Sequence, residues 1–220
     1  MIIFSIINNN LKEELNKNLK LLEKASIDNA SLVEYKDKIE KENIDLKQEI
    51  TRLEKEIQTL TQKAVFDSSD LKKLSNVTEK ELKTVLINTN MVELIPYIIE
   101  AEKRYEVNAL FMTALIANES SWNTSQKAKT LNNITGFGVY NYKVNRRGRN
   151  FESKAQCIFA TAELLSESYL DPSGSFYNGK SVEGVNIRYC LNDDGTVDYN
   201  WSNTIKSIAI NLRNEINSYY

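Results

Sequence analysis

The chain has 220 residues, with 28 Lys and Arg, 30 Asp and Glu, and no histidine. Catalysis by a serine or cysteine nucleophile that histidine activates is therefore excluded, and so is a zinc site with histidine ligands. Two cysteines, Cys157 and Cys190, are too few for a disulfide framework or a metal centre, so we expect no metal and no cofactor. A pI of about 5.5 argues against nucleic acid as the main partner.

The chain begins with a short apolar stretch, MIIFSII, which no basic residue precedes and which runs into three asparagines at 8–10. A secretory signal has a basic start and a longer apolar stretch, so we predict that this segment is not one. No run of the sequence approaches the ~18 apolar residues that span a bilayer. We therefore expect no membrane partner.

Residues 8–64 are predicted to form one long helix that associates as a coiled coil. The segment lacks Gly and Pro and holds a single aromatic residue, Tyr35. Apolar residues repeat every seven positions, at d in Leu32, Ile39, Leu46, Leu53 and Leu60 and at a in Ile50 and Ile57. Polar residues at other a positions, Asn29, Lys36 and Asn43, fix the register of such a helix pair. We expect a homo-oligomer, either a parallel dimer or a trimer, with a lone solvated helix as the alternative.

A polar stretch follows, and we predict a linker over residues 65–77 and a globular domain over residues 78–220. Thr78 and Glu81 have the spacing of a capping box, which opens a helix. Apolar segments at 85–99, 109–117 and 155–165 and a last helix at about 202–216 indicate a mainly α domain. No alternating pattern is long enough for a substantial sheet, so we expect only a small irregular or β portion.

One carboxyl group is a candidate catalytic acid. Asn108 has the position of a helix N-cap, and the helix after it, 109–117, is apolar on all sides, so we expect it to be buried. Glu119 stands at its end, three residues before Trp122. Burial there would raise the pKa of the carboxyl group and keep it protonated, as a general acid requires. The alternative is that Glu119 marks the point where the helix reaches solvent.

Several segments, taken in order and spacing, resemble glycoside hydrolase family 73, the bacterial and phage endo-β-N-acetylglucosaminidases that cut peptidoglycan. The resemblance covers about residues 76–212. It rests on AEKRYEVNAL (101–110), ALIANESSWNTS (114–125), NNITGFG (132–138), FES (151–153), LLSESYL (164–170) and GVNIRY (184–189). It implies a lysozyme-like α+β fold and peptidoglycan glycan strands as the substrate.

The resemblance also implies roles for individual residues. Glu119 matches the family's general acid, and Tyr189 matches a tyrosine that lies near that acid. The expected substrate-binding residues follow the acid or lie on and after the Asn-Asn turn, and they are Ser120, Trp122, Ser125, Asn133, Gly136, Phe137 and Tyr140. The related lytic transglycosylases usually continue from Glu-Ser into a Gly-Leu-Met-Gln turn, which this sequence lacks.

A second catalytic carboxylate is harder to place. Glycosidases commonly pair the acid with another Asp or Glu, but residues 136–151 contain neither. The nearest candidate is Glu152, followed by Asp193 and Asp194. In the alternative, the substrate's own acetamido group attacks the anomeric carbon, and Tyr189 positions that group or a water molecule.

We therefore predict a peptidoglycan hydrolase that cleaves the β-1,4 bond between N-acetylglucosamine and N-acetylmuramic acid. The rivals are a structural coiled-coil protein with an inactive hydrolase domain, and a muramidase or lytic transglycosylase. The basic cluster at 143–149 is predicted to be a solvated loop and not a nucleic-acid site. Without a secretory signal, we expect carriage on a phage particle, release to the wall on lysis, or another route to the cell wall.

Overall fold

The computed structural model describes residues 2–138, 148–192 and 194–219, and the side chains in these ranges except those of 2–11 and 57–64. The chain divides into two units, Met1–Gln58 and Thr59–Tyr220. Within the described residues, no helix combines the length and the apolar character that crossing a membrane requires.

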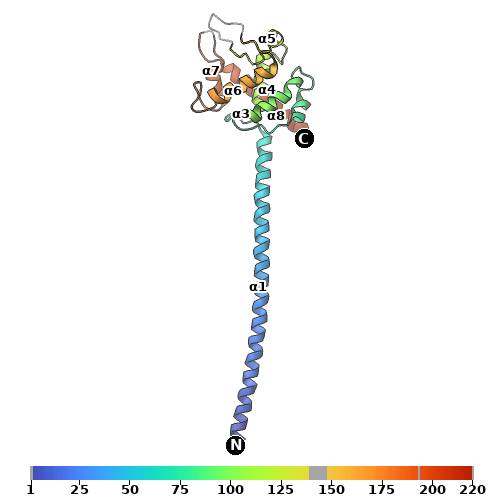
Figure 1. The fold of residues 1–220 in the computed structure, drawn as a ribbon, viewed down its shortest axis with the longest axis vertical. Helices are drawn as coiled ribbons and strands as arrows, with labels where there is room; N and C mark the ends of the chain where they lie inside the picture. The colour runs from blue at the N-terminus through green and yellow to red at the C-terminus, as the bar shows by residue number, and fades with distance from the viewer. Residues whose placement is uncertain (1, 139–147, 193, 220) are drawn as a thin grey trace. The chain divides into compact units, whose positions relative to one another are not determined.

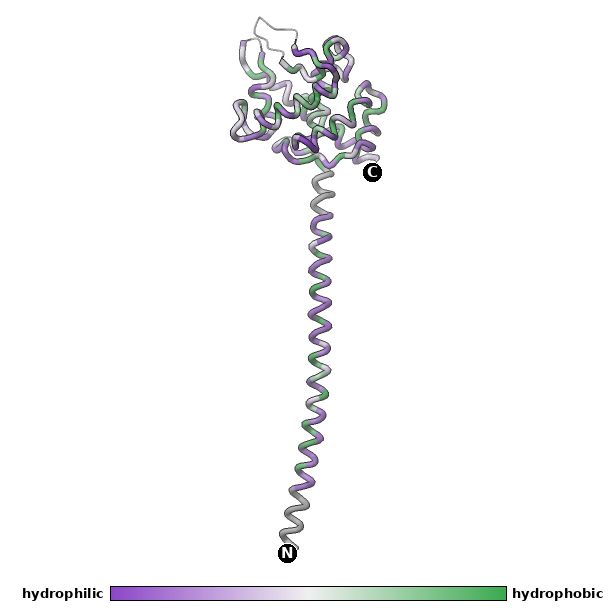
Figure 2. The backbone as a smooth tube through the Cα atoms, in the orientation of Figure 1, coloured by the Kyte–Doolittle hydropathy of each residue, from purple (hydrophilic) through white to green (hydrophobic). Residues whose placement is uncertain are grey.

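The described residues of the first unit are all helical and make up most of α1, which runs from Ile2 to Ala64 (Figure 1). At 1.5 Å per residue, the 63 residues of α1 measure roughly 95 Å. Every side chain from 12 to 56 is exposed, including those of Leu32 at 64% and Leu46 at 60%. Figure 2 shows hydrophobic and hydrophilic residues alternating along the helix. The long helix that the sequence predicted is confirmed, and its apolar residues find no burial within the unit.

The second unit is built from short helices. They are α2 (Glu79–Leu86), the 3-10 turn η1 (Val92–Leu94), α3 (Ile95–Tyr105), α4 (Ala109–Ser120), α5 (Gln126–Thr130), α6 (Lys154–Leu164), the π-helical turn η2 (Leu165–Tyr169), α7 (Val182–Tyr189) and α8 (Tyr199–Tyr219). Most begin at a side-chain cap that accepts a hydrogen bond from the first turn: Thr78, Asn108, Ser125, Ser153 and Ser181. The capping box of Thr78 and Glu81 and the cap at Asn108 are both as predicted.

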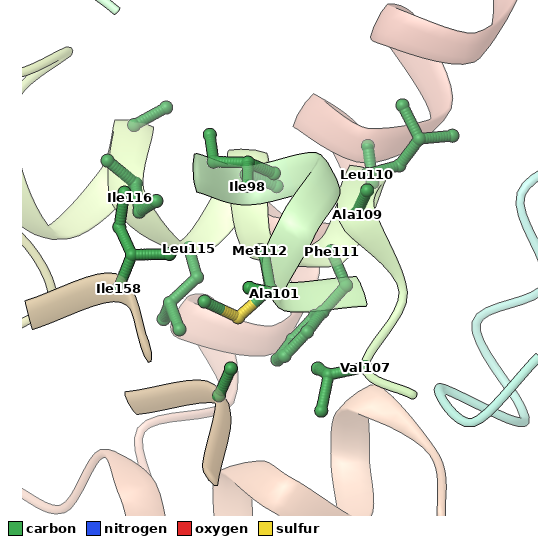
Figure 3. Packing of buried hydrophobic residues seen from close by; sticks show 14 of the residues in the cluster. Ile98, Ala101, Val107, Ala109, Leu110, Phe111, Met112, Leu115, Ile116 and Ile158 are labelled. Atoms are coloured by element: carbon green, nitrogen blue, oxygen red, sulfur yellow. The ribbon is translucent and has the colours of Figure 1, made fainter. Parts of the chain in front are cut away.

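The core forms around α4, which packs against α3 and α8. Ten of the twelve residues of α4 are buried. Figure 3 shows apolar side chains from α3, α4 and α6 gathered in this core, among them Ile98, Leu115 and Ile158. Because α4 is covered on all sides, its C-terminal end can hold a polar group in a place from which water is largely excluded.

Residues 65–77, which we expected to form a linker, pack as part of the second unit. Leu71 is fully buried, its backbone N–H donates to the carbonyl of Lys180 at 2.8 Å, and its carbonyl accepts from Asn108 at 2.9 Å. Val77 is also buried and belongs to the same core. The sequence predicted a linker because most residues of the stretch are polar, but two of its apolar residues, Leu71 and Val77, are buried in the core of the domain.

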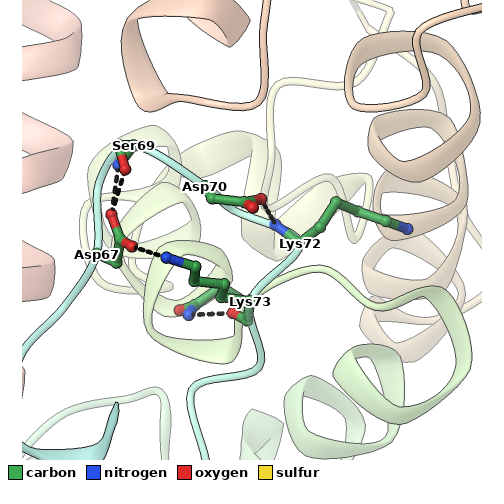
Figure 4. A network of polar contacts seen from close by, with 6 residues as sticks. Asp67, Ser69, Asp70, Lys72 and Lys73 are labelled. Atoms are coloured by element: carbon green, nitrogen blue, oxygen red, sulfur yellow. Dashed lines mark hydrogen bonds and ion pairs between the residues drawn. The ribbon is translucent and has the colours of Figure 1, made fainter. Parts of the chain in front are cut away.

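Polar contacts fix the start of the same segment (Figure 4). Asp67 accepts hydrogen bonds from Ser69 and from the ammonium of Lys73, and Asp70 accepts from the backbone N–H of Lys72. The Lys73 ammonium holds the pKa of Asp67 at about 2. The segment therefore has a defined local structure.

Two features differ from the expected pattern. The apolar segment 85–99 is split, because α2 ends at Leu86 and α3 begins at Ile95. Pro96 lies in the first turn of α3, where its missing N–H has no intrahelical partner to lose. The mainly α class is confirmed, and no β-strand occurs in the described ranges, where the expected β portion reduces to one bridge between Leu191 and Val197.

Candidate active site

Glu119 lies in the last turn of α4, where the helix leaves the core, and its side chain is half-buried. The indole Nε1 of Trp201, on α8, donates to Glu119 Oε1 at 2.7 Å. The amide Nδ2 of Asn118 donates to the same oxygen at 3.4 Å. Burial raises the pKa of Glu119 by more than these hydrogen bonds and the charge of Lys127 lower it. This is the direction that the sequence predicted.

The turn at 132–138 brings its backbone against this carboxyl group. Gly136 has a φ of +69°, and a Cβ there would lie 2.9 Å from Glu119 Oε2. Glycine is therefore required both by the left-handed backbone and by the space. Asn133 fixes the turn from inside: its Oδ1 accepts from the Phe137 N–H at 3.0 Å, and its Nδ2 donates to the carbonyls of Phe137 and Arg149 at 2.9 and 3.0 Å.

Tyr189 stands behind Trp201. Their rings lie 5.2 Å apart between centroids at an interplanar angle of 32°, and the Tyr189 hydroxyl donates to the carbonyl of Thr135 at 2.8 Å. Burial, and after it the negative charge of Glu119, hold the pKa of Tyr189 well above its ordinary value. Tyr189 is therefore a neutral phenol that ties α7 to the turn and supports the indole that contacts Glu119.

A buried polar cluster lies next to the turn. Thr135 Oγ1 is 2.7 Å from Thr161 Oγ1 and 3.4 Å from Cys157 Sγ, and all three residues are fully buried. Burial raises the pKa of the Cys157 thiol. The sequence prediction of a buried free cysteine is confirmed for Cys157.

The segment after Glu119 turns sharply. Ser121, Trp122 and Asn123 have φ angles of +50°, +56° and +66°, an uncommon run for residues with side chains. Ser120 holds it, because its Oγ donates to the Ile116 carbonyl at 2.5 Å and accepts from the Asn123 N–H at 2.7 Å. The result leaves the Trp122 side chain 37% exposed beside the end of α4. Ser120 is thus a buried structural residue, and Trp122 is available for contact.

Two other predicted binding residues have defined structural contacts. Ser125 caps α5 by accepting from the Ala128 N–H at 3.2 Å. Phe137 packs edge-on against Phe151 with ring centroids 5.6 Å apart, and the Arg149 guanidinium lies 5.6 and 5.1 Å from the two ring centroids. Phe137 is only partly buried, so one part of its surface remains open.

The predicted second carboxylates lie apart from these contacts. Glu152 is exposed just before α6, and the groups that shift the pKa of Glu119 do not include it. Asp194 is exposed and accepts from Thr196, whereas Asp193, Tyr140 and residues 143–147 lie outside the described residues. In the part of the chain that is described, no three His, Cys, Asp or Glu side chains group as metal ligands would.

Sequence reasoning missed Trp201. It is one of two tryptophans in the chain and is 4% exposed. A buried indole N–H requires an acceptor, and that rule could have marked it as a partner of some polar group. The identity of the acceptor could not be read, because Glu119 lies 82 positions away.

A family model matches the part of the chain that carries these residues. The model of the glucosaminidase family, described as mannosyl-glycoprotein endo-beta-N-acetylglucosaminidase, matches residues 95–214. The chain belongs to this family. The matched range of the glucosaminidase domain contains Glu119, Gly136, Tyr189 and Trp201.

Two relatives come from Streptococcus pneumoniae, one from serotype 4 and one from strain R6, and both carry the name "Putative endo-beta-N-acetylglucosaminidase". Each is 28% identical to the chain over 156 residues, which is 69% of this chain. The matched part is 23% of the first relative and 21% of the second, so the chain spans less than a quarter of the curated relatives it matches.

Solved structures of S. aureus autolysin E share the fold. One superposes with a TM-score of 0.54 at 16% identity and covers 73% of this chain and 78% of that one. Another, a catalytic mutant with a glutamate replaced by alanine in complex with the disaccharide NAG-NAM, gives a TM-score of 0.53 at 15% identity over 72% of this chain and 78% of that one. At these identities the likeness establishes the arrangement of the helices.

Proposed function

We propose that the glucosaminidase domain hydrolyses the β-1,4 bond between N-acetylglucosamine and N-acetylmuramic acid in peptidoglycan, with Glu119 as the general acid. The observation that carries the proposal is the environment of this carboxyl group. Burial at the end of α4 raises its pKa, and a carboxylic acid that stays protonated can donate its proton to the leaving glycosidic oxygen.

The comparisons support the choice of substrate. The family and the two streptococcal relatives are named for endo-β-N-acetylglucosaminidase activity, and the structurally similar autolysin E has been solved with the disaccharide NAG-NAM and with a muropeptide. Trp122 and Phe137, one on each segment next to Glu119, present partly exposed aromatic rings. Such rings offer apolar faces against which a sugar ring can pack.

In the proposed reaction the substrate itself supplies the nucleophile. The causes of the pKa shift of Glu119 are burial, two hydrogen bonds and a lysine, and none of them is another carboxylate. In the proposed path the acetamido carbonyl oxygen attacks the anomeric carbon, the glycosidic bond breaks, and Glu119 protonates the leaving oxygen. Water then attacks the anomeric carbon, opens the cyclic intermediate and gives a proton back to the Glu119 carboxylate, so the anomeric configuration is retained and the acid is regenerated. The Tyr189 hydroxyl donates to the Thr135 carbonyl, and a phenol oxygen that donates keeps lone pairs with which, in the proposed path, it would accept from the amide or from that water.

Digestion of purified peptidoglycan tests the bond and the acid together. We expect the wild type to release fragments with reducing N-acetylglucosamine ends and Glu119→Gln to lose this release by at least 100-fold, because an amide cannot act as the acid. The matched control is Glu215→Gln, an exposed glutamate on α8, which should retain full activity.

Each of the other possible products would indicate one of the alternative functions. Reducing N-acetylmuramic acid would indicate a muramidase, and 1,6-anhydromuramic acid would indicate a lytic transglycosylase. Absence of release by folded wild type would favour a structural protein with an inactive domain. Product with inverted anomeric configuration would contradict the substrate-assisted path and leave the role of Glu119 standing.

We also propose that α1 pairs with α1 of a second copy, or of two, in a parallel coiled coil. The residues at the predicted d positions Ile39, Leu46 and Leu53 are 40%, 60% and 43% exposed in the single chain. Burying such a stripe between identical helices removes apolar surface from water and provides the stabilisation that one isolated helix lacks.

Sedimentation equilibrium measures this association. Wild type should have two or three times the monomer mass of 25.2 kDa, and the double variant Ile39→Lys with Leu46→Lys should have the mass of a monomer. Gln48→Lys, which places a lysine on the opposite face of the heptad, is the control and should associate like wild type. A monomeric wild type would leave α1 as a solvated helix.

A further inference from the structure

The two oxygens of the Glu119 carboxyl group have different surroundings. Oε1 accepts from the Trp201 indole at 2.7 Å and from the Asn118 amide at 3.4 Å. Oε2 is the oxygen that a Cβ at Gly136 would approach to 2.9 Å. In the described part of the chain no hydrogen-bond donor reaches Oε2, so the hydrogen bonds that the carboxyl group accepts converge on Oε1.

An indole N–H donates and has no lone pair with which to accept. An acid proton on Oε1 pointing at Trp201 would therefore meet another hydrogen instead of an acceptor. The protonated form of Glu119 consequently carries its O–H on Oε2, while Oε1 keeps its hydrogen bond from the indole.

Trp201 is itself held in place. Its side chain is 4% exposed, its ring packs on Tyr189 at 5.2 Å, and its backbone N–H donates to the Asp198 carbonyl at 3.2 Å where α8 begins. The Tyr189 hydroxyl in turn donates a hydrogen bond to the carbonyl of Thr135, the residue that directly precedes Gly136. The support of the indole and the turn that faces Oε2 therefore belong to one connected set of contacts.

We propose that Trp201 is the positioning residue of the proposed general acid: its indole N–H fixes Glu119 Oε1, so that the transferable proton is held on Oε2, facing the Gly136 turn. This inference rests on the proposed function only in naming Oε2 as the source of the proton in the reaction. The contact between the indole and the carboxyl group can be tested without any turnover.

The first test observes the indole protons of the full chain by NMR after labelling tryptophan with nitrogen-15. The chain contains only Trp122 and Trp201, so two indole signals are expected, and Trp201→Phe assigns them. The Trp201 signal should move downfield as Glu119 ionises with rising pH, because a carboxylate is the stronger acceptor. Within the described residues the Trp122 indole donates to no carboxyl group, so its signal serves as the internal reference.

The same titration in Glu119→Gln should leave the Trp201 signal unmoved, whereas Glu215→Gln should titrate like wild type. Among the described residues, the other charged or titratable groups that interact with Glu119 are Lys127, Tyr189 and Cys190. Burial raises the pKa of Tyr189 and of Cys190, so these two groups change charge at higher pH than a carboxyl group. A Trp201 signal that stays fixed in wild type, or that still titrates in Glu119→Gln, would overturn the proposal.

The second test measures turnover of peptidoglycan by Trp201→Phe, which keeps an aromatic ring for Tyr189 but lacks the donor. We expect kcat to fall roughly 10- to 100-fold with KM little changed, because only the orientation of the acid is lost. Loss of a hydrogen bond to the ionised form also raises the pKa of the acid, so the alkaline limb of the kcat profile should move to higher pH. A structural role would lower kcat at every pH without moving that limb.

Should Trp201→Phe fail to fold, benzothienylalanine at position 201 replaces it, because this residue keeps the shape of tryptophan and carries sulfur in place of the N–H. Wild-type kcat and an unmoved alkaline limb with this residue would overturn the proposal. If the Trp201 signal titrates with Glu119 but Glu119→Gln still releases product, the contact stands and the proposed general acid is wrong. The two failures are therefore distinguishable.

Discussion

α1 and α4 are both regular helices, but the apolar residues of α4 are buried within the chain and those described in α1 are exposed. In α4 ten of twelve residues are buried within the chain, whereas in α1 every side chain from 12 to 56 is exposed. Burial in α4 stabilises the domain and places Glu119 at a half-buried position at the end of the helix. The apolar stripe of α1 is not buried by its own chain, and the proposed coiled coil would give these residues a surface to pack against.

The largest expected effect tests this difference directly. Phe111→Ala in α4 removes a fully buried ring and should lower the free energy of unfolding by about 3–5 kcal/mol. Leu46→Ala in α1 should leave the unfolding of the domain unchanged. Both tryptophans lie in the second unit, so urea denaturation followed by tryptophan fluorescence reports on the domain alone. An equal shift in both variants would show that the two regions are not energetically separate.

The second prediction concerns the backbone that faces the end of α4. Gly136→Ala should lower peptidoglycan turnover at least tenfold, because the new Cβ would displace Glu119 Oε2. Gly195→Ala is the matched control, since Gly195 also has a positive φ, +83°, but an added Cβ there meets no atom within 4 Å. Both should lose about 1 kcal/mol of stability from backbone strain. Equal activity in the two variants would show that contact with Glu119 is not what requires glycine.

A smaller effect is expected at the cap of α2, where loss of the capping threonine can be compared with loss of another threonine in the same helix. Thr78→Ala removes both the Oγ1 that accepts from the Glu81 N–H and the hydroxyl that donates to Glu81, and should cost about 1 kcal/mol by the same fluorescence measurement. Thr84→Ala, on the exposed side of the same helix, loses only a bond to the Lys80 carbonyl. Its unfolding midpoint should match that of wild type within error.

The smallest expected effect is the stability cost of keeping the acid buried. Because the pKa of Glu119 is raised in the folded state, the folded protein binds the proton more tightly than the unfolded one. Stability is therefore lost as pH rises from the ordinary value of 4.5 through the folded value. Glu119→Gln should melt slightly above wild type at pH 7, and the difference should disappear below about pH 4. A difference that does not depend on pH would assign the change to packing.

The parts of this structure that the sequence predicted are those with a local signal. The apolar run of α4, the cap at Asn108 and the position of Glu119 at the helix end follow from periodicity and from residue types within twelve positions. The burial of Leu71 and Val77 had no such signal, because two apolar residues in a polar stretch show no period. The hydrogen bond from the Trp201 indole to Glu119 depends on how α8 packs on α4, which only the tertiary fold determines.

The buried cluster next to the turn gives the protein a built-in chemical reporter. Cys157 is shielded beside Thr135, and burial also raises the pKa of Cys190, the residue that follows α7, to about 11. A thiolate is the form that alkylating reagents attack, so neither sulfur should react while the fold is closed. The rate at which iodoacetamide modifies Cys157 would then time the opening of the segment that carries Gly136.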